Sequence, residues 1–345
     1  MKLRNININE RMKHYNVSGL SIAEIDHGQI SNTECFGFLE AGTNNKVNSN
    51  SIFNACSISK FLTAMLVMKL TEQGILDLDE DVNKRLSSWK VPDNELTKIK
   101  KVTLRNLLCH QSGIIDPKGS FTELNPINVY PSMAELLEGR TSYCKMPIEV
   151  QYEPESDFQY SDAGFCIIQQ LIEDVTGKPF KKVMTELIFH PLLMKNSTFE
   201  MTLLEDKIEN FSCGHNKNGK LIDRKYPIYP YLAASGLLTT PSDIAILVIE
   251  LMNALKGESK IGLSATRSKE MINSQGGKEW TGLGLFLDPS EHEVEISSLG
   301  WGTGFQCMMV AHPYLETGIV IMTNTDLGVH QLKGIIGEIY NSLTS

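Results

Sequence analysis

A serine and a lysine stand three residues apart at the head of a long apolar segment, residues 54–70, NACSISKFLTAMLVMKL. If this segment is helical, Ser57 and Lys60 share one face, one turn apart. A serine hydroxyl is a weak nucleophile that needs a neighbouring base. Burial would lower the pKa of Lys60, so that its neutral amine could accept the hydroxyl proton. The spacing therefore fits nucleophilic catalysis, although alone it also fits a helix cap beside a lysine that reaches solvent.

Two later segments carry polar residues at the start of a helix and at the end of a strand. FQYSDAGF places Tyr160 and Asp162 directly before a helix, and SSLGWGTGF places Ser298 and Gly300 at the end of a strand. Taken singly, they read as a half-buried tyrosine with a capping aspartate and as a glycine-rich turn. Together, in this order, the three segments resemble the three-motif active site of serine β-lactamases and penicillin-binding proteins. The likeness is greatest to the branch of class C β-lactamases, D-alanyl-D-alanine carboxypeptidases, D-aminopeptidases and related esterases.

The resemblance covers nearly the whole chain and implies a β-lactamase/transpeptidase-like fold. Segments that look like the framework of this superfamily are VTLRNLLCHQSGI (102–114), VTGKPF (175–180), IFHPLLMKNSTF (188–199) and AASGLLTTPSDIA (233–245). His110 matches a framework histidine in the first of these segments and is expected to be structural. No cofactor is implied.

The site residues follow from the resemblance, position by position. Ser57 is implied as the acyl-forming nucleophile, Lys60 as its proton partner and Tyr160 as a second base. The third motif falls on residues 298–300, because a Gly-Phe pair follows at the expected distance, at 304–305, whereas a motif at 302–304 would lose that spacing. The oxyanion hole is then implied to consist of the backbone N–H groups of Ser57 and Trp301, with Asp162, Ser298 and Gly300 contacting the substrate.

Two positions depart from the superfamily pattern. Asp162 stands where asparagine is usual, and Ser298 stands where lysine or histidine is usual. A carboxylate facing Lys60 would stabilise the ammonium form of the lysine. Without a cation at Ser298, a substrate carboxylate would receive only a neutral hydrogen bond, which is weaker than a charge-assisted one. We therefore expect slow or absent turnover of β-lactams.

These observations favour a serine hydrolase that acts through an acyl-enzyme on an ester or a small peptide-like amide. The alternatives are a β-lactamase or D-Ala-D-Ala carboxypeptidase, and a catalytically weakened relative that serves as a binding module. The fold alone does not choose among them, because one scaffold hosts many chemistries.

The elements expected around these residues form a mixed α/β fold of the α+β type. Alternating residues around Asp26-His27-Gly28 predict a β-hairpin, and three consecutive strands are expected within residues 293–325. Helices are expected from Ser57 to Gly74, over 162–176, from Ile244 onward and near the C-terminus. We predict an antiparallel sheet flanked by N- and C-terminal helices. Residues 1–78 and 223–345 would form this split domain, with an all-helical insertion, 79–222, and the active site at their interface.

Composition limits the partners. The 345 residues carry a formal charge of −9, which argues against nucleic-acid binding. The seven cysteines are scattered without a CxxC pair, as in reduced cytosolic proteins, and Cys56 is expected to be a buried apolar residue. We see no signal-peptide core, no membrane-spanning run and no metal-binding motif, and expect a cytoplasmic protein with a small-molecule substrate. The oligomeric state is left open.

Overall fold

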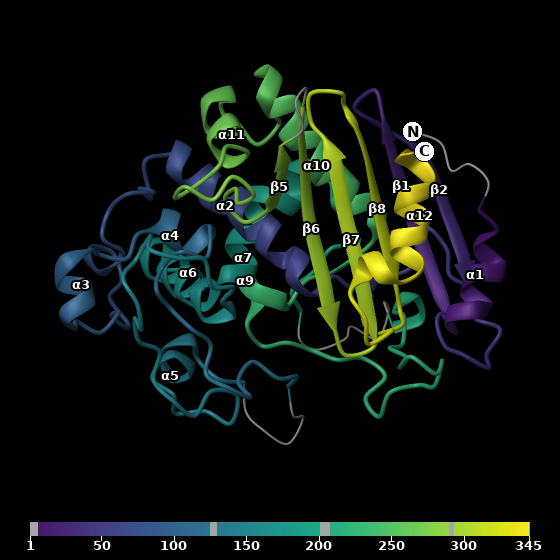
Figure 1. The fold of residues 1–345 in the computed structure, drawn as a ribbon, viewed down its shortest axis with the longest axis horizontal. Coiled ribbons are helices and arrows are strands. Elements are labelled where there is room, and N and C mark those ends of the chain that lie inside the picture. The colour runs from purple at the N-terminus through teal and green to yellow at the C-terminus, as the bar shows by residue number, and fades with distance from the viewer. Residues whose placement is uncertain (1–5, 125–129, 201–207, 290–292, 345) are drawn as a thin grey trace.

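One antiparallel sheet runs through the molecule. The computed structural model describes residues 6–124, 130–200, 208–289 and 293–344. Six strands form the sheet in the order β2-β1-β8-β7-β6-β5, and every neighbouring pair is antiparallel (Figure 1). Their bounds are β1 Gly19–Asp26, β2 Gln29–Gly37, β5 Phe286–Pro289, β6 Val294–Gly302, β7 Phe305–His312 and β8 Thr317–Thr323. β3 (Phe53–Asn54) and β4 (Leu238–Thr239) form a separate two-stranded ladder.

The expected N-terminal hairpin and the three C-terminal strands are present. β1 and β2 are joined at His27 and Gly28, both of which have positive φ, 51° and 66°. Such a two-residue turn matches the right-handed twist of the strands that it joins. β1 then pairs with β8, so strands from the two ends of the chain lie side by side at the centre of the sheet.

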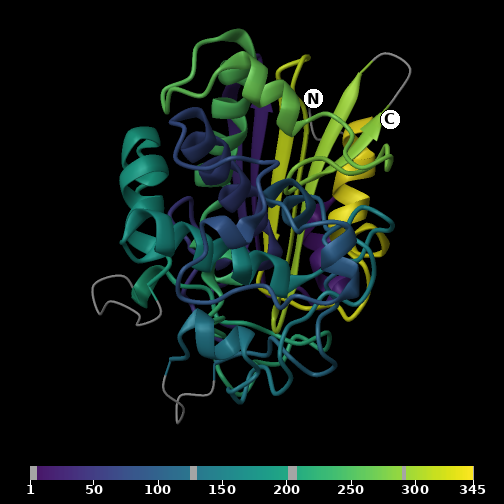
Figure 2. The same cartoon turned by 90° about the vertical axis from the view of Figure 1, so that its left-hand side faces the viewer.

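Helices cover both faces of the sheet, as Figures 1 and 2 show. Alternate residues of the central strands point to opposite faces. One face packs against α1 (Ile8–Tyr15) and α12 (Ile335–Thr344) through a cluster that includes Leu20 and Ile321. The opposite face belongs to the main core, with α2 (Ser59–Glu72) and α10 (Pro241–Lys256). The predicted antiparallel sheet flanked by helices is thus confirmed, with both terminal helices on the same face.

The middle of the chain is built from short helices and loops. The remaining helices are α3 Glu95–Ile99, α4 Leu104–Leu108, α5 Met133–Leu137, α6 Asp162–Thr176, α7 Phe180–Met184, α8 His190–Leu192, α9 Leu232–Ser235 and α11 Ala265–Met271. α6 ends at Gly177 with φ 64°, as its sequence predicts, but its cap is Ser161, and Asp162, the capping residue considered from the sequence, is the first residue of the helix. α10 starts three residues earlier than expected, because Thr240 caps it and Pro241 occupies its first turn. Within the described residues, no helix is long and apolar enough to cross a membrane.

The segment that carries Ser57 lies deep in the main core. A 3₁₀ turn, Cys56–Ile58, leads directly into α2, which is buried on nearly all sides. Gly300 of β6 packs against the start of this turn, where a Cβ atom would overlap the Ala55 carbonyl oxygen and the Cys307 sulfur. A residue without a side chain at position 300 therefore allows β6 to approach the turn.

Candidate active site

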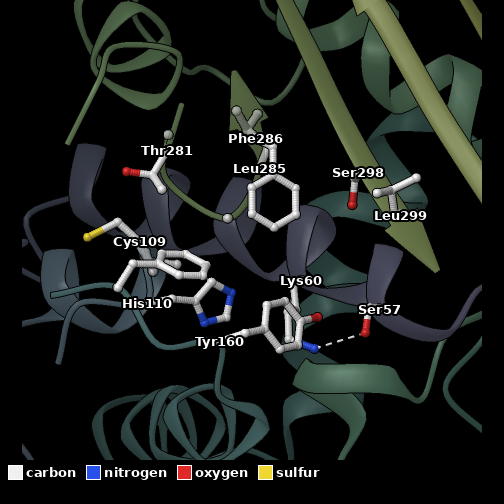
Figure 3. A pocket seen from close by; sticks show the side chains of 14 residues that line it. Ser57, Lys60, Cys109, His110, Tyr160, Thr281, Leu285, Phe286, Ser298 and Leu299 are labelled. Atoms are coloured by element: carbon white, nitrogen blue, oxygen red, sulfur yellow. Dashed lines mark hydrogen bonds between the residues drawn. The ribbon is translucent and has the colours of Figure 1, made fainter. Parts of the chain in front are cut away.

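Lys60 lies at the centre of the candidate site with three acceptors around its amine. Its Nζ donates to Ser57 Oγ at 3.1 Å, to Asp162 Oδ1 at 2.5 Å and to the Ala234 carbonyl at 3.0 Å. Figure 3 shows the contact with Ser57. An ammonium has three N–H donors and no acceptor. These three partners therefore match the protonated form of Lys60.

The charge of Lys60 differs from the sequence-based expectation. Burial is the largest single influence and lowers the pKa of its ammonium, but the charge and hydrogen bond of the Asp162 carboxylate, together with smaller contributions from Tyr160, raise the pKa above its usual value. The expectation of a neutral amine in the resting protein is therefore wrong. Its physical cause is the aspartate at 162, whose expected position facing Lys60 the structure reproduces.

Tyr160 lies against the same amine. The Lys60 Nζ is 4.7 Å from the centre of the Tyr160 ring, and the His110 ring stacks on the other side of the tyrosine at 4.4 Å. Burial raises the pKa of the Tyr160 hydroxyl, with the Lys60 charge opposing it. The tyrosine thus also keeps its proton in the resting site.

His110 is a structural neighbour of the site rather than one of its proton carriers. Its Nδ1 accepts the backbone N–H of Ser161 at 3.1 Å, which requires an unprotonated nitrogen. Burial, aided by the Lys60 charge, lowers the pKa of His110 well below its usual value. The structure therefore agrees with the framework role expected from the sequence.

Asp116 holds the start of α6 and was not foreseen from the sequence. Its carboxylate accepts three hydrogen bonds, from Ser161 Oγ at 2.7 Å and from the backbone N–H groups of Asp162 and Ala163 at 2.8 and 3.0 Å. A carboxylate at a helix N-terminus satisfies N–H groups that lack partners within the helix. Asp116 therefore fixes the turn that presents Tyr160 and Asp162.

A roomy cavity lies on one side of Ser57. Its volume is about 360 Å³, and its lining residues include Asp162, Tyr229 and Trp301. The Trp301 indole is exposed and donates to Asp326 Oδ1 at 2.8 Å. The Thr303 N–H donates to the Tyr229 hydroxyl at 2.9 Å. Ser57 and the end of β6, where the oxyanion donors were expected, thus meet at one cavity.

A second, narrow cavity contains Ser57 together with Ser298. Its volume is only about 20 Å³, which is close to the minimum that holds one water molecule. Figure 3 shows Leu285 and Phe286 above the Tyr160 ring and Ser298 at the side of the pocket near Ser57. Ser298 is buried and lines this pocket. The structure thus brings Ser57, Lys60, Tyr160, Asp162 and Ser298 together.

Other reactive side chains near the site are buried or dispersed. Cys56, beside Ser57, is 1% exposed, and burial raises the pKa of its thiol far above the usual range. This fits the expected role of a small buried residue. In the described part of the chain, no group of three or more His, Cys, Asp or Glu side chains is placed to hold a metal ion.

Comparison with known proteins shows the family to which the chain belongs. The family model described as Beta-lactamase matches residues 5–334. The chain belongs to the beta-lactamase family. Protein flp of Staphylococcus aureus (strain N315) is 22% identical over 319 residues, and the match covers 89% of this chain. Penicillin-binding protein 4* of Bacillus subtilis (strain 168) is 26% identical over 201 residues, covering 56% of this chain and 41% of the relative. The chain spans about 60% of the length of the flp relatives that it matches.

Solved structures confirm the fold of this family member. An octameric penicillin-binding protein homologue from Pyrococcus abyssi has a TM-score of 0.77 at 23% identity, covering 97% of this chain and 75% of its own. A D-amino acid amidase from Ochrobactrum anthropi SV3 has a TM-score of 0.75 at 20% identity, and the match covers 98% of this chain and 99% of the amidase chain. The D-alanine carboxypeptidase AmpC from Burkholderia cenocepacia has a TM-score of 0.74 at 18% identity, and the match covers 97% of this chain and 96% of the carboxypeptidase chain. Hydrolases of amides and peptides thus share this architecture.

Proposed function

We propose that this member of the beta-lactamase family is a serine hydrolase that forms an acyl-enzyme on Ser57. The contact that supports the proposal most is the 3.1 Å hydrogen bond between Lys60 Nζ and Ser57 Oγ. The hydroxyl opens to a cavity large enough for a small substrate. Nucleophile, proton carrier and substrate space therefore meet at one point, which is the pattern that covalent catalysis requires.

The chemistry begins when Lys60 loses a proton to solvent. A neutral amine would keep two N–H groups, for Asp162 and the Ala234 carbonyl, and would turn its lone pair to Ser57. The Ser57 Oγ then bonds to the substrate carbonyl carbon while its proton moves to Lys60. The backbone N–H groups of Ser57 and Trp301 stabilise the oxyanion. The C–O or C–N bond to the leaving group breaks as that group gains a proton, with Tyr160 assisting, and water then releases the acyl group.

The substrate that we propose is an ester or a small peptide-like amide without a carboxylate near the reacting bond. Ser298 is uncharged, and the roomy cavity is lined by the carboxylates of Glu123, Asp162 and Asp326. The Lys60 ammonium is already paired with Asp162. A penicillin carboxylate would meet the acidic residues Glu123 and Asp326 and would find no cation at Ser298. β-Lactams should therefore acylate Ser57 poorly, which makes a β-lactamase or D-Ala-D-Ala carboxypeptidase the runner-up among the enzyme functions. A cytosolic location belongs to the same proposal and rests on the sequence.

A non-catalytic binding module is the second candidate, because the resting Lys60 is held as an ammonium by Asp162. Intact-mass measurement decides between the two. The protein is incubated with a fluorophosphonate, a neutral aryl ester or a penicillin, beside Ser57→Ala. Catalysis predicts a fluorophosphonate adduct on Ser57, turnover of the ester and little penicillin adduct, all lost in the variant. If neither an adduct nor turnover is detected, the result would support the non-catalytic binding module. Rapid penicillin turnover would favour the β-lactamase.

A further inference from the structure

Gln331 lies behind the peptide that joins Gly300 to Trp301. Its side chain is 2% exposed and extends from a 3₁₀ turn, Gln331–Lys333, that follows β8. Its Nε2 donates to the Gly300 carbonyl at 2.8 Å and lies 3.5 Å from the carbonyl of Cys307, the partner of Gly300 on β7. A buried amide that serves two strand carbonyls fixes where those carbonyls point.

The position of the Gly300 carbonyl determines the position of the Trp301 N–H. The two groups belong to one planar trans peptide and point in opposite directions. With the carbonyl directed to Gln331, the N–H is directed away from Gln331. Trp301 and Ser57 line the same cavity. We propose that Gln331 is a positioning residue that aims the Trp301 N–H at the oxyanion. This inference rests on the proposed function.

The peptide needs such support because β6 is paired on only one side at this point. β5 pairs with residues 294–297 of β6, whereas residues 298–302 pair with β7 alone. Gly300 has no Cβ atom to restrict its backbone rotation. The tight packing of Gly300 on Ala55 leaves no room for a side chain that would restrict it. Gln331 supplies that restriction from the opposite side of the peptide.

The test removes the donor and asks whether the stabilisation of the oxyanion is lost specifically. Gln331→Met keeps the length of the side chain without the N–H groups, and Gln331→Glu keeps its shape. Acylation of Ser57 is measured with a neutral aryl ester and with its thionoester, in which sulfur replaces the carbonyl oxygen. Sulfur accepts hydrogen bonds weakly, so a loss of oxyanion donors slows the ester far more than the thionoester. Rates are divided by the concentration of sites titrated with fluorophosphonate, so a partly folded variant still gives a result.

We expect the ester to acylate Ser57 ~10–100-fold more slowly in Gln331→Met than in the wild type, a smaller loss than the deletion of an oxyanion donor causes. The ratio of the ester rate to the thionoester rate should fall. The matched control is Gln170→Met, because Gln170 is also buried but donates to Asp174 on α6. It should leave the ratio unchanged. Equal loss with both substrates, or an unchanged rate, would overturn the role of Gln331. A wild-type protein that never acylates Ser57 would overturn the proposed function instead.

Discussion

At the scale of single residues, the Lys60–Asp162 pair determines how much of the proposed base, Lys60, is unprotonated. Burial lowers the pKa of Lys60, but Asp162, with a smaller contribution from Tyr160, raises it above its usual value. The neutral amine is therefore scarce near pH 7 and becomes more abundant as the pH rises. We expect kcat/KM for a neutral aryl ester to increase with pH through the neutral and alkaline range.

Asp162→Asn should make this base available at lower pH. Removal of the carboxylate leaves burial as the main influence on Lys60, so the rising limb of the pH–rate profile should move to lower pH. The rate at pH 7 should increase at least ~10-fold, the scale of a close charge pair. Lys60→Arg is the control, since arginine does not deprotonate, and it should acylate at least ~100-fold more slowly. Superimposable profiles for wild type and Asp162→Asn would contradict this assignment.

His110 should make the fold sensitive to mild acid. Burial lowers the pKa of the folded-state imidazole, so its contribution to stability is complete above the unfolded-state value, about 6.5, and is lost as the pH falls below it. The melting temperature should therefore fall between pH 8 and pH 5. In His110→Asn, whose side-chain oxygen can still accept the Ser161 N–H, the fall should be smaller. Equal slopes for the two proteins would refute the prediction.

At the scale of elements, the N-terminus of α6 depends on Asp116. Asp116→Ala would leave two backbone N–H groups and the Ser161 hydroxyl without this acceptor, at a cost of about 1–3 kcal/mol for each unpaired buried group. We expect a lower melting temperature and slower acylation of Ser57. Asp174→Ala is a matched control, because Asp174 also accepts two backbone N–H groups and a hydroxyl, those of Ser87 and Ser88. It should reduce stability without slowing acylation. Equal acylation rates in the two variants would show that Asp116 does not position the candidate site.

The elements that the sequence predicts best are those with local signals. α6 has a capping serine and a terminal glycine, and the first hairpin has clear alternation around its turn. β5 was missed because its four residues carry no such pattern. Asp116 was missed because it lies 45 residues before Ser161, within a segment read as a loop. The Ala234 contact is made by a backbone carbonyl, which any residue could supply. The candidate site residues can be predicted from the sequence, but their charge states cannot, because these depend on contacts between segments far apart in the chain.

At the scale of the whole molecule, cysteines are distributed through the folded interior. All seven are free thiols within described residues, and only Cys35 is more than slightly exposed. Titration with a thiol reagent should therefore detect about one reactive group in the native protein and all seven after unfolding in denaturant. Fewer than seven in denaturant without reductant would indicate disulfides, and several in the native state would indicate a looser core than the one described. The proposed division at residues 78 and 223 stays a prediction.

The pairing of β1 with β8 also constrains how the molecule is made. β1 pairs with β2 on one edge, but its partner on the other edge is β8, residues 317–323. At the usual rate of protein synthesis, ~5–20 residues per second, β1 waits roughly 15–60 s with one edge unpaired. Ser57 leaves the ribosome long before the peptide at Gly300 that would complete its oxyanion hole. The proposed nucleophile is therefore synthesised early, and it would become competent only when the final strands close the sheet. A nascent chain would contain Ser57 without the second oxyanion donor.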